Sequence, residues 1–588
     1  MNLSIVHTTI WKEIMKRVKK KLVSLLMTGM LLAGALTGCS GAGASPEAPS
    51  EAGSETVPGT QAVEDIQAVG DIQAVEDIQT AAGASAAEQV GAQDSVQAGA
   101  PKYVFLFIGD GMSYPQVQLT NYFLSASQAD AGKTVAVDGE EKTILQSKNH
   151  LAMMDFPVAG SAQTFDSTSF APDSASTATS IATGKKTWSG SINVSEDFTQ
   201  TYETIAEKLK AQKDYKIGVL STVNLNHATP AAFYAHQASR SSYYDIGLEL
   251  IESGFDYFAG GGLLQTTGKN EDQEDLYTLA ENAGYQVVKT QAEAEALGAD
   301  SGKVIVIDEH LADSSAMSYE LDRGQEEWAL ADYVEKGIEV LDNETGFFMM
   351  VEGGKIDWAC HANDAASTIT DTIALDNAVE KAVEFYEQHP EETLIIVTGD
   401  HETGGLTIGF AGTDYDTFLK NFENQKISYA KFDSDYVSVY KENKTDFAQV
   451  MLDVTELFGL QAPAGEGSSA TQQKDSADLH PESGNDGALV MTDYEYGLLK
   501  GAYETTMSRT GEEEEFAQDE YIRYGSYEPL TVTITHILNN KSGVNFGSYA
   551  HTGLPVEVLV KGTGSDSFDG YYDNTDIYNR LAALLGVE

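Results

Sequence analysis

The chain has 588 residues, of which 42% are hydrophobic, so it is long and apolar enough to bury a large core. Its formal net charge of -54 excludes nucleic-acid binding by the surface as a whole, because so negative a field repels the phosphate backbone. Only two cysteines, Cys39 and Cys360, are present, which excludes a disulfide framework.

The N-terminus has the pattern of an export signal. A basic segment, Lys16–Lys21, precedes an apolar stretch from Leu22 to Leu36 that is too short to span a bilayer comfortably. The stretch ends in Leu-Thr-Gly-Cys39, which resembles a bacterial lipobox. We therefore expect residues 1–38 to be a lipoprotein signal peptide and Cys39 to carry lipid that anchors the exported protein at the outer face of a bacterial cell membrane. The alternative is a plain signal peptide with an incidental cysteine, and Met15 is an alternative start.

Residues 39–99 are expected to form a disordered tether. They are rich in Ala, Gly, Ser, Glu and Gln, and a short repeat recurs at 65–69, 71–75 and 77–79. The repeat has too little apolar content to build a core. Loss of residues 1–38 would remove six Lys/Arg and one Glu and leave a net charge of -59. An anion site in this protein would need concentrated positive charge of its own, which bound divalent metal ions would supply.

The globular part is expected at residues 100–588. Strand-like and helix-like patterns alternate there, for example the helix-like Asp376–Val383 before the apolar run at Leu394, which indicates βαβ units and a mostly parallel sheet of the α/β class. The pattern loosens between Asp414 and Leu530, so we expect an insertion at about 414–530. Strand-like sequence then returns at Leu530–Ile534.

Four short apolar runs, each typical of a buried strand, are followed by residues that can bind metal ions. The runs and their followers are 103–108 before Asp110, 217–220 before His227 and Thr229, 347–351 before Glu352, and 394–397 before Asp400 and His401. Open α/β sheets place their ligands at the carboxyl ends of such strands. We therefore expect Asp110, Glu352, Asp400 and His401 to converge on one crevice.

Two further patterns point to the same chemistry. Asp357 and His361 are four residues apart, so on a helix they share one face and can hold one ion, for which zinc is well suited. Pro172 precedes a run of small residues that predicts a helix with Ser174 in its first turn, where the helix dipole and free N–H groups favour an anion. A metal ion nearby could turn this serine into a nucleophile, whereas the alternative is an ordinary helix cap.

Together these motifs resemble, in order and local spacing, the alkaline phosphatases. The matching residues are Asp110, Asp173, Ser174, Ala175, Thr229, Pro230, Arg240, Glu352, Asp357, His361, Asp400, His401 and His551. The resemblance covers about residues 102–564. It implies a three-layer sandwich with a large, mostly parallel central sheet and an inserted crown-like region. It also implies hydrolysis of phosphate monoesters through a phosphoserine, with two zinc ions and a third ion, normally magnesium, and related enzymes are often homodimers.

The resemblance also implies roles for individual residues. Ser174 would be the nucleophile, Arg240 would bind phosphate and Asp173 would orient Arg240. The expected ligands of the first zinc are Asp357, His361 and His551, those of the second are Asp110, Asp400 and His401, and those of the third ion are Asp110, Thr229 and Glu352. The chain has His227 and Trp358 where the best-known bacterial members have an acidic residue and a lysine. His227 is thus either a ligand, which would favour zinc over magnesium at the third site, or a hydrogen-bonding neighbour.

Three other functions were weighed. A sulfatase would need a modifiable cysteine or serine followed by Pro and Arg, whereas Ser174 is followed by Ala175 and Ser176. A phosphodiesterase could share the metal ligands, although the serine and Arg240 favour monoesters. A surface lipoprotein that merely binds metal or phosphate would be expected to have lost the nucleophile or a ligand, and none is lost.

Overall fold

The computed structural model describes residues 99–127, 132–137, 140–145, 147, 149–463, 489–509 and 516–588. The expected signal peptide, Cys39 and all of the expected tether except residue 99 lie outside these residues. The described residues all belong to one compact unit, 93–588. No helix among them has both the length and the apolar composition needed to cross a membrane.

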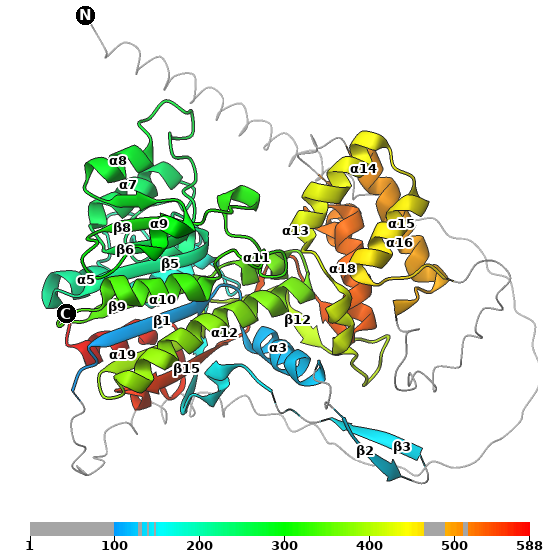
Figure 1. Ribbon diagram of the computed structural model, residues 1–588, viewed down its shortest axis with the longest axis horizontal. Helices are drawn as coiled ribbons and strands as arrows, with labels where there is room; N and C mark the ends of the chain where they lie inside the picture. The colour runs from blue at the N-terminus through cyan, green and yellow to red at the C-terminus, as the bar shows by residue number, and fades with distance from the viewer. Residues whose placement is uncertain are drawn as a thin grey trace, which may run out of the picture. The chain divides into compact units, whose positions relative to one another are not determined.

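The strands and helices alternate along most of the chain (Figure 1). The strands are β1 (Tyr103–Gly109), β2 (Gly132–Val137), β3 (Glu140–Leu145), β4 (Val158–Gln163), β5 (Lys216–Asn224), β6 (Tyr257–Gly261), β7 (Gln286–Val288), β8 (Val304–Ile307), β9 (Phe347–Gly353), β10 (Thr393–Gly399), β11 (Glu402–Thr403), β12 (Leu406–Ile408), β13 (Val544–Phe546), β14 (His551–Thr552), β15 (Val556–Gly562) and β16 (Gly570–Asp573). The helices are α3 (Tyr114–Ala126), α4 (Ser174–Thr183), α5 (Ile205–Lys213), α6 (Ala228–Ala231), α7 (Tyr243–Ser253), α8 (Leu276–Asn282), α9 (Gln291–Glu295), α10 (Leu330–Leu341), α11 (Lys355–His361), α12 (Ala365–Gln388), α13 (Tyr429–Phe432), α14 (Ser438–Asn443), α15 (Phe447–Phe458), α16 (Asp493–Ser508), α17 (Gln518–Tyr524), α18 (Pro529–Lys541) and α19 (Thr575–Leu585).

Ten of the described strands form one sheet in the order β16-β4-β15-β10-β1-β9-β5-β6-β8-β7. Neighbouring strands are parallel except where β15 pairs with β10 and with β4. The strand β15 therefore runs against the other nine. The large, mostly parallel central sheet predicted from the sequence is confirmed.

Helices cover both faces of this sheet. Alternate side chains of β1 point to opposite faces, so Phe105 and Phe107 belong to one hydrophobic cluster, while Leu106 and Ile108 belong to another. The first cluster includes residues of α3, α10 and α12, and the second includes residues of α4, α5, α7 and α19. The fold is thus a three-layer α/β/α sandwich whose strands are buried on both sides, which explains their continuous apolar runs.

Most local predictions agree with the structure. The four apolar runs lie in β1, β5, β9 and β10, and the helix-like Asp376–Val383 lies inside α12. One prediction was wrong, because Leu530–Ile534 belongs to the helix α18 and not to a strand. Pro529 opens this helix at a position where its missing N–H costs nothing. The β-branched residues that suggested a strand have only a weak intrinsic preference, and burial of Leu530 and Ile534 outweighs it.

Within the expected insertion, the described residues form a helical cluster with a hydrophobic core of its own. Residues of α13, α14, α15 and α16 pack with α18, and Figure 1 draws this cluster in yellow and orange. Two contacts link α18 to the turn after α11: His536 Nε2 lies 2.9 Å from Asn363 Oδ1, and Asn539 Nδ2 donates to the Asn363 carbonyl at 2.8 Å. The cluster therefore supports the helix that carries Asp357 and His361. The limits of the insertion, about 414–530, stay a prediction.

Candidate active site

The carboxyl ends of three adjacent parallel strands meet at the site. β1 lies between β10 and β9, and the last residues of the three strands are in register. Asp110 follows β1, Asp400 and His401 follow β10, and Glu352 is near the end of β9. All four side chains are fully buried. The convergence expected from the sequence is therefore present in the structure.

Two of these residues, Asp110 and His401, contact the hydroxyl of Ser174, and Asp400 lies beside them. His401 Nε2 lies 3.2 Å from Asp110 Oδ1 and 3.4 Å from Asp400 Oδ2. The Ser174 hydroxyl oxygen lies 3.1 Å from the same His401 nitrogen and 3.3 Å from Asp110 Oδ1. Asp400 is held in place by the Gly111 amide at 3.1 Å and by the Thr177 hydroxyl at 3.1 Å. Two carboxylates and one imidazole thus lie together next to a serine hydroxyl, and this donor set suits zinc.

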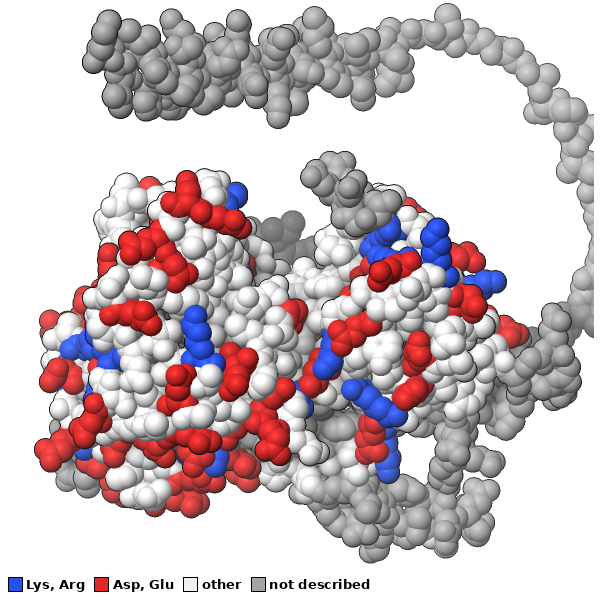
Figure 2. All heavy atoms as spheres, turned by 45° about the horizontal axis from the view of Figure 1, so that its top comes forward, with Lys and Arg blue, Asp and Glu red and all other residues white. Residues whose placement is uncertain are grey.

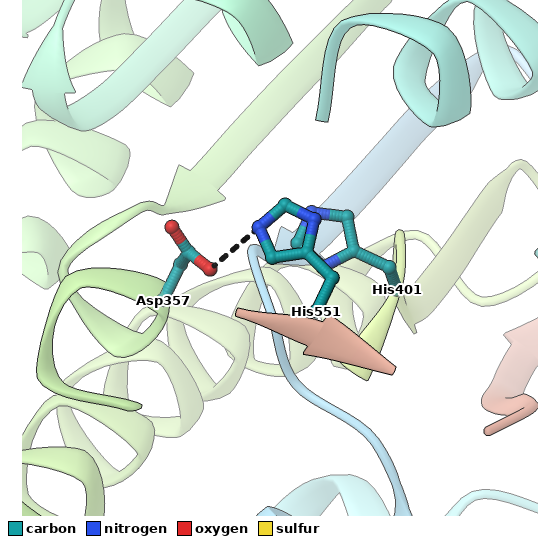
Figure 3. Close-up of side chains that lie close together, drawn as sticks. All are labelled: Asp357, His401 and His551. Atoms are coloured by element: carbon teal, nitrogen blue, oxygen red, sulfur yellow. Dashed lines mark ion pairs between the residues drawn. The ribbon is translucent and has the colours of Figure 1, made fainter. Parts of the chain in front are cut away.

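A second group of donors lies beside the first. Asp357 and His361 lie on α11, with His361 Nε2 3.4 Å from Asp357 Oδ2. His551, which comes from β14, has its Nε2 3.6 Å from Asp357 Oδ1 (Figure 3). The rings of His551 and His401 are stacked, with centroids 3.7 Å apart, so the two groups of ligand candidates lie next to each other (Figure 3). The three ligands expected for the first zinc are therefore neighbours.

The hydrogen bonds of two histidines indicate a cation between them. His361 Nδ1 lies 2.7 Å from the Tyr549 carbonyl and His551 Nδ1 lies 2.5 Å from the Pro172 carbonyl. A carbonyl only accepts, so each Nδ1 carries a proton, and in the neutral form of each ring Nε2 then presents a lone pair. These two Nε2 atoms are 3.1 Å apart and face Asp357. A metal ion satisfies such facing lone pairs, and backbone carbonyls commonly orient metal-binding histidines in this way.

The expected ligands of the third ion also fit a metal. Within the described residues, Asp110 Oδ2, Thr229 Oγ1 and Glu352 Oε1 are buried and have no hydrogen-bond partner. The other oxygen of Glu352 accepts a hydrogen bond from the Ser221 hydroxyl. Buried polar atoms rarely stay unpaired, and carboxylate and hydroxyl oxygens are the ligands that magnesium prefers. His227 Nδ1 is likewise buried without a partner in the part of the chain that the structure describes.

Burial shifts the pKa values of these groups. It raises the pKa of Asp110 well above its usual range, with a further contribution from the Asp400 carboxylate, and it raises that of Glu352 to about 8. Burial also opposes ionisation of Asp357, but the nearby histidines, His361 above all, outweigh it and hold the pKa of Asp357 well below its usual range. Burial, reinforced by His401, lowers the pKa of His551 to about 3. Crowded buried carboxylates are a favourable environment for cations.

The nucleophile candidate begins α4. Asp173 is the N-cap of this helix and accepts a hydrogen bond from the Ser176 amide at 3.1 Å, which leaves Ser174 at the first helical position, as predicted. Arg240 Nη1 donates to Asp173 Oδ2 at 2.9 Å, and its Nη2 lies 3.4 Å from His227 Nε2. Asp173 therefore orients both the serine helix and the guanidinium group.

These groups open into one pocket with a volume of about 400 Å³. Its lining includes Ser174, Arg240, Asp357, His361 and His551. The pocket thus presents a hydroxyl, a guanidinium group and the metal-ligand candidates to one small ligand.

Several residues with roles at the site were not predicted. The Thr403 hydroxyl donates to Asp357 Oδ1 at 2.6 Å and lies 3.2 Å from His401 Nδ1, so it joins the two groups of ligands. Its place two residues after His401 is the only signal that the sequence offered. The carbonyls of Pro172 and Tyr549 left no signal, because every residue has a carbonyl.

The comparisons with known proteins agree with this geometry. The alkaline phosphatase family model matches residues 101–587. The chain belongs to the alkaline phosphatase family. Among curated relatives, alkaline phosphatase 4 of Bacillus subtilis is 27% identical over 420 residues, which are 70% of this chain and 76% of the relative. The protein is accordingly an enzyme that hydrolyses phosphate monoesters, and a phosphoserine intermediate is the general mechanism of its family.

Solved structures share the fold. A cold-active alkaline phosphatase from Shewanella sp. is 25% identical, with a TM-score of 0.63, over 82% of this chain and 99% of the other. A His-to-Asp variant of the alkaline phosphatase from the Antarctic bacterium TAB5, described with Mg bound in its M3 site, is 23% identical with a TM-score of 0.53, over 83% and 99% of the two chains. The expected architecture is confirmed by these likenesses.

Proposed function

We propose that Ser174 is the nucleophile of this phosphatase. The observation that carries the assignment is a buried serine hydroxyl at the start of α4 that faces Asp110 and His401 and opens into the pocket. The Ser174 oxygen loses its proton and attacks phosphorus, the bond from phosphorus to the alcohol oxygen breaks, and the alcohol leaves with a proton. Water then cleaves the phosphoserine, which releases phosphate and restores the serine hydroxyl. The N–H groups at the start of α4 favour the phosphate oxygens.

Arg240 is proposed to hold the phosphate group. Its fork is anchored at one nitrogen by Asp173, which keeps the guanidinium plane fixed beside Ser174 in the pocket. Although burial opposes the charged form of Asp173, Arg240 and hydrogen bonds hold the pKa of Asp173 below its usual value. The ion pair is therefore present across the working pH range, and a fixed fork suits the two oxygens of a phosphate.

Three metal ions are proposed to complete the site. Bound there, they would supply positive charge that favours the serine alkoxide and the phosphate oxygens. The proposed ligands are Asp357, His361 and His551 for one zinc, Asp110, Asp400 and His401 for the other, and Asp110, Thr229 and Glu352, with His227 as a further candidate, for magnesium or a replacing zinc. Magnesium at the third position is supported by the unpaired carboxylate and hydroxyl oxygens there.

The protein is further proposed to be exported and held at the outer face of the bacterial membrane by lipid on Cys39. The basic segment, the short apolar stretch and the lipobox-like end support this. One acyl chain binds a membrane only marginally, so we expect more than one on the anchor. A homodimer is proposed by likeness to related enzymes.

Replacement of Ser174 by alanine tests the central assignment. The S174A variant should lose phosphomonoesterase turnover by about a thousandfold or more while its zinc content stays the same, because the serine is a nucleophile. The matched control is S180A, since the Ser180 hydroxyl lies in the same helix and bonds only to the Ser176 carbonyl among the described residues. Unchanged turnover in S174A with intact metal content would remove Ser174 from this role.

The reaction class is tested with the unmodified enzyme. Metal analysis should find zinc, and the rate with a phosphate monoester should exceed the rates with a diester and a sulfate ester. A faster diester or sulfate reaction would replace the proposal with a diesterase or sulfatase.

A further inference from the structure

Three aromatic side chains line the same pocket as Ser174. Trp358, Tyr429 and Tyr527 belong to its wall, together with the phosphate-binding groups. The rings of Tyr429 and Tyr527 are 5.9 Å apart at 83°, and the Tyr319 hydroxyl donates to or accepts from that of Tyr429 at 3.2 Å. The aromatic wall is thus held in place by contacts of its own. An alcohol group attached to a phosphate at Ser174 shares this small pocket with these rings.

A second pocket of about 620 Å³ borders the first. Asp313 lines both pockets, and the segment 428–430 contributes Tyr429 to the first and its two neighbours to the second. Carboxylates dominate the charged lining of the second pocket: Glu309, Asp313, Asp322 and Asp435, against Lys431 and His310. A chain that extends from the phosphate site therefore passes aromatic rings and then enters an acidic groove.

The protein neutralises part of this negative charge. Asp313 is paired with the buried Lys355 at 2.6 Å, and the same ammonium group lies 4.6 Å from the centre of the Trp358 ring, so one face of that ring already holds a cation. Asp322 forms no ion pair among the described residues, but Lys431 and Lys355 lie near enough to act on its charge. Glu309 and Asp435 line the groove without an ion-pair partner among the residues that the structure describes. Acidic side chains are also spread over the wider surface, as Figure 2 shows for one face, so the test must separate the groove from this general field.

We propose that this wall and groove form a leaving-group site that selects phosphate monoesters whose alcohol carries an ammonium group. The proposal rests on the proposed function, because the site acts only on substrates held at Ser174. Aromatic faces attract ammonium groups, best when these are quaternary and weakly hydrated. The carboxylates beyond them attract the same charge and repel alcohols that bear a second phosphate or a carboxylate. A neutral alcohol group is stabilised only by contact with the aromatic rings.

The test compares two substrates of the same size and shape. One is choline phosphate, whose quaternary ammonium charge does not depend on pH, and the other is its uncharged isostere, with carbon in place of the ammonium nitrogen. At low ionic strength, kcat/KM should be about tenfold higher for choline phosphate. At about 0.5 M salt the ratio should fall to about threefold, since exposed carboxylates are screened and close ring contacts are screened less.

Variants separate the two parts of the site. Tyr527→Leu should lower the ratio about threefold at both salt concentrations, because one aromatic face is removed. The double variant Glu309→Gln, Asp435→Asn should lower the ratio only at low salt. The control is Glu380→Gln, an exposed carboxylate on α12 outside both pockets, which should leave the ratio unchanged.

A kcat/KM ratio near one in the unmodified enzyme would overturn the proposal. The proposal would also fail if Glu380→Gln lowered the ratio as much as the groove variants do, because the negative charge of the whole surface would then be the cause. Failure of Tyr527→Leu to fold would leave the substrate pair and the double variant to decide. If neither substrate is hydrolysed, the proposed function fails as well, whereas equal hydrolysis of both overturns only the leaving-group site.

Discussion

Replacing Arg240 by lysine keeps the charge at the phosphate site but removes the planar fork. Arg240 Nη1 is 2.9 Å from Asp173 Oδ2, and the two side chains are only 24% and 21% exposed, so solvent weakens this pair little. The second nitrogen, Nη2, stays available toward the pocket beside His227. Lysine has one nitrogen for both tasks and must give up at least one charge-assisted hydrogen bond. Such a bond contributes about 1.5–3 kcal/mol, which corresponds to about 10- to 150-fold in affinity.

The assay is inhibition by inorganic phosphate, measured together with kcat/KM for a simple monoester. R240K should raise the inhibition constant for phosphate by about this factor and lower kcat/KM, with zinc content unchanged. The matched control is R580K on α19, where the arginine donates to two backbone carbonyls, those of Ser567 and Asp569, far along the chain from the site. Equal inhibition constants in R240K and the unmodified enzyme would refute a phosphate contact for Arg240.

Three further predictions concern other parts of the molecule. His227→Asp should increase the affinity for magnesium, because a carboxylate suits magnesium better than an imidazole does. Calorimetry measures this affinity, and equal values in the two proteins would show that His227 is only a structural neighbour. Cys39→Ser should move the enzyme from the membrane fraction to the medium with the same specific activity, and retention in the membrane would argue against the lipobox. Although burial opposes its charged form, Glu207 and Glu249 raise the pKa of His236 to about 10. The charged His236 therefore stabilises the fold in full below about pH 6.5 and loses this effect as the pH rises through about 10. The difference in unfolding free energy between the unmodified protein and His236→Gln should shrink over that range. A difference that does not change with pH would contradict the assignment.

Much of the site could be predicted because its parts are local patterns. The strand ends before Asp110 and Asp400, the four-residue spacing of Asp357 and His361, and the helix start at Ser174 each depend on a few adjacent residues. Their positions in a parallel sheet then bring them together without further information.

The rest depends on contacts between distant segments. The Val and Thr residues at the start of α18 favour a strand, while the burial that decides its conformation comes from other helices, which range from α13 to α16. The aromatic wall joins Trp358 on α11 to Tyr429 and Tyr527, which lie near opposite ends of the expected insertion, and no local pattern relates them. The role of Arg240 and the division of the ligands among three ions follow from the family resemblance, because no local pattern in the sequence separates them.

The direction of β15 has a consequence for how the enzyme matures. Because β15 runs against its neighbours, its beginning lies at the edge where the parallel strands end, and the segment before it delivers His551 to the site. His551 binds the carbonyl of Pro172, 379 residues earlier in the chain. Contacts of such high sequence separation form late in folding. Synthesis must therefore pass residue 551 before Asp357, His361 and His551, the proposed ligands of the first zinc, can come together, and metal uptake should follow the docking of this segment.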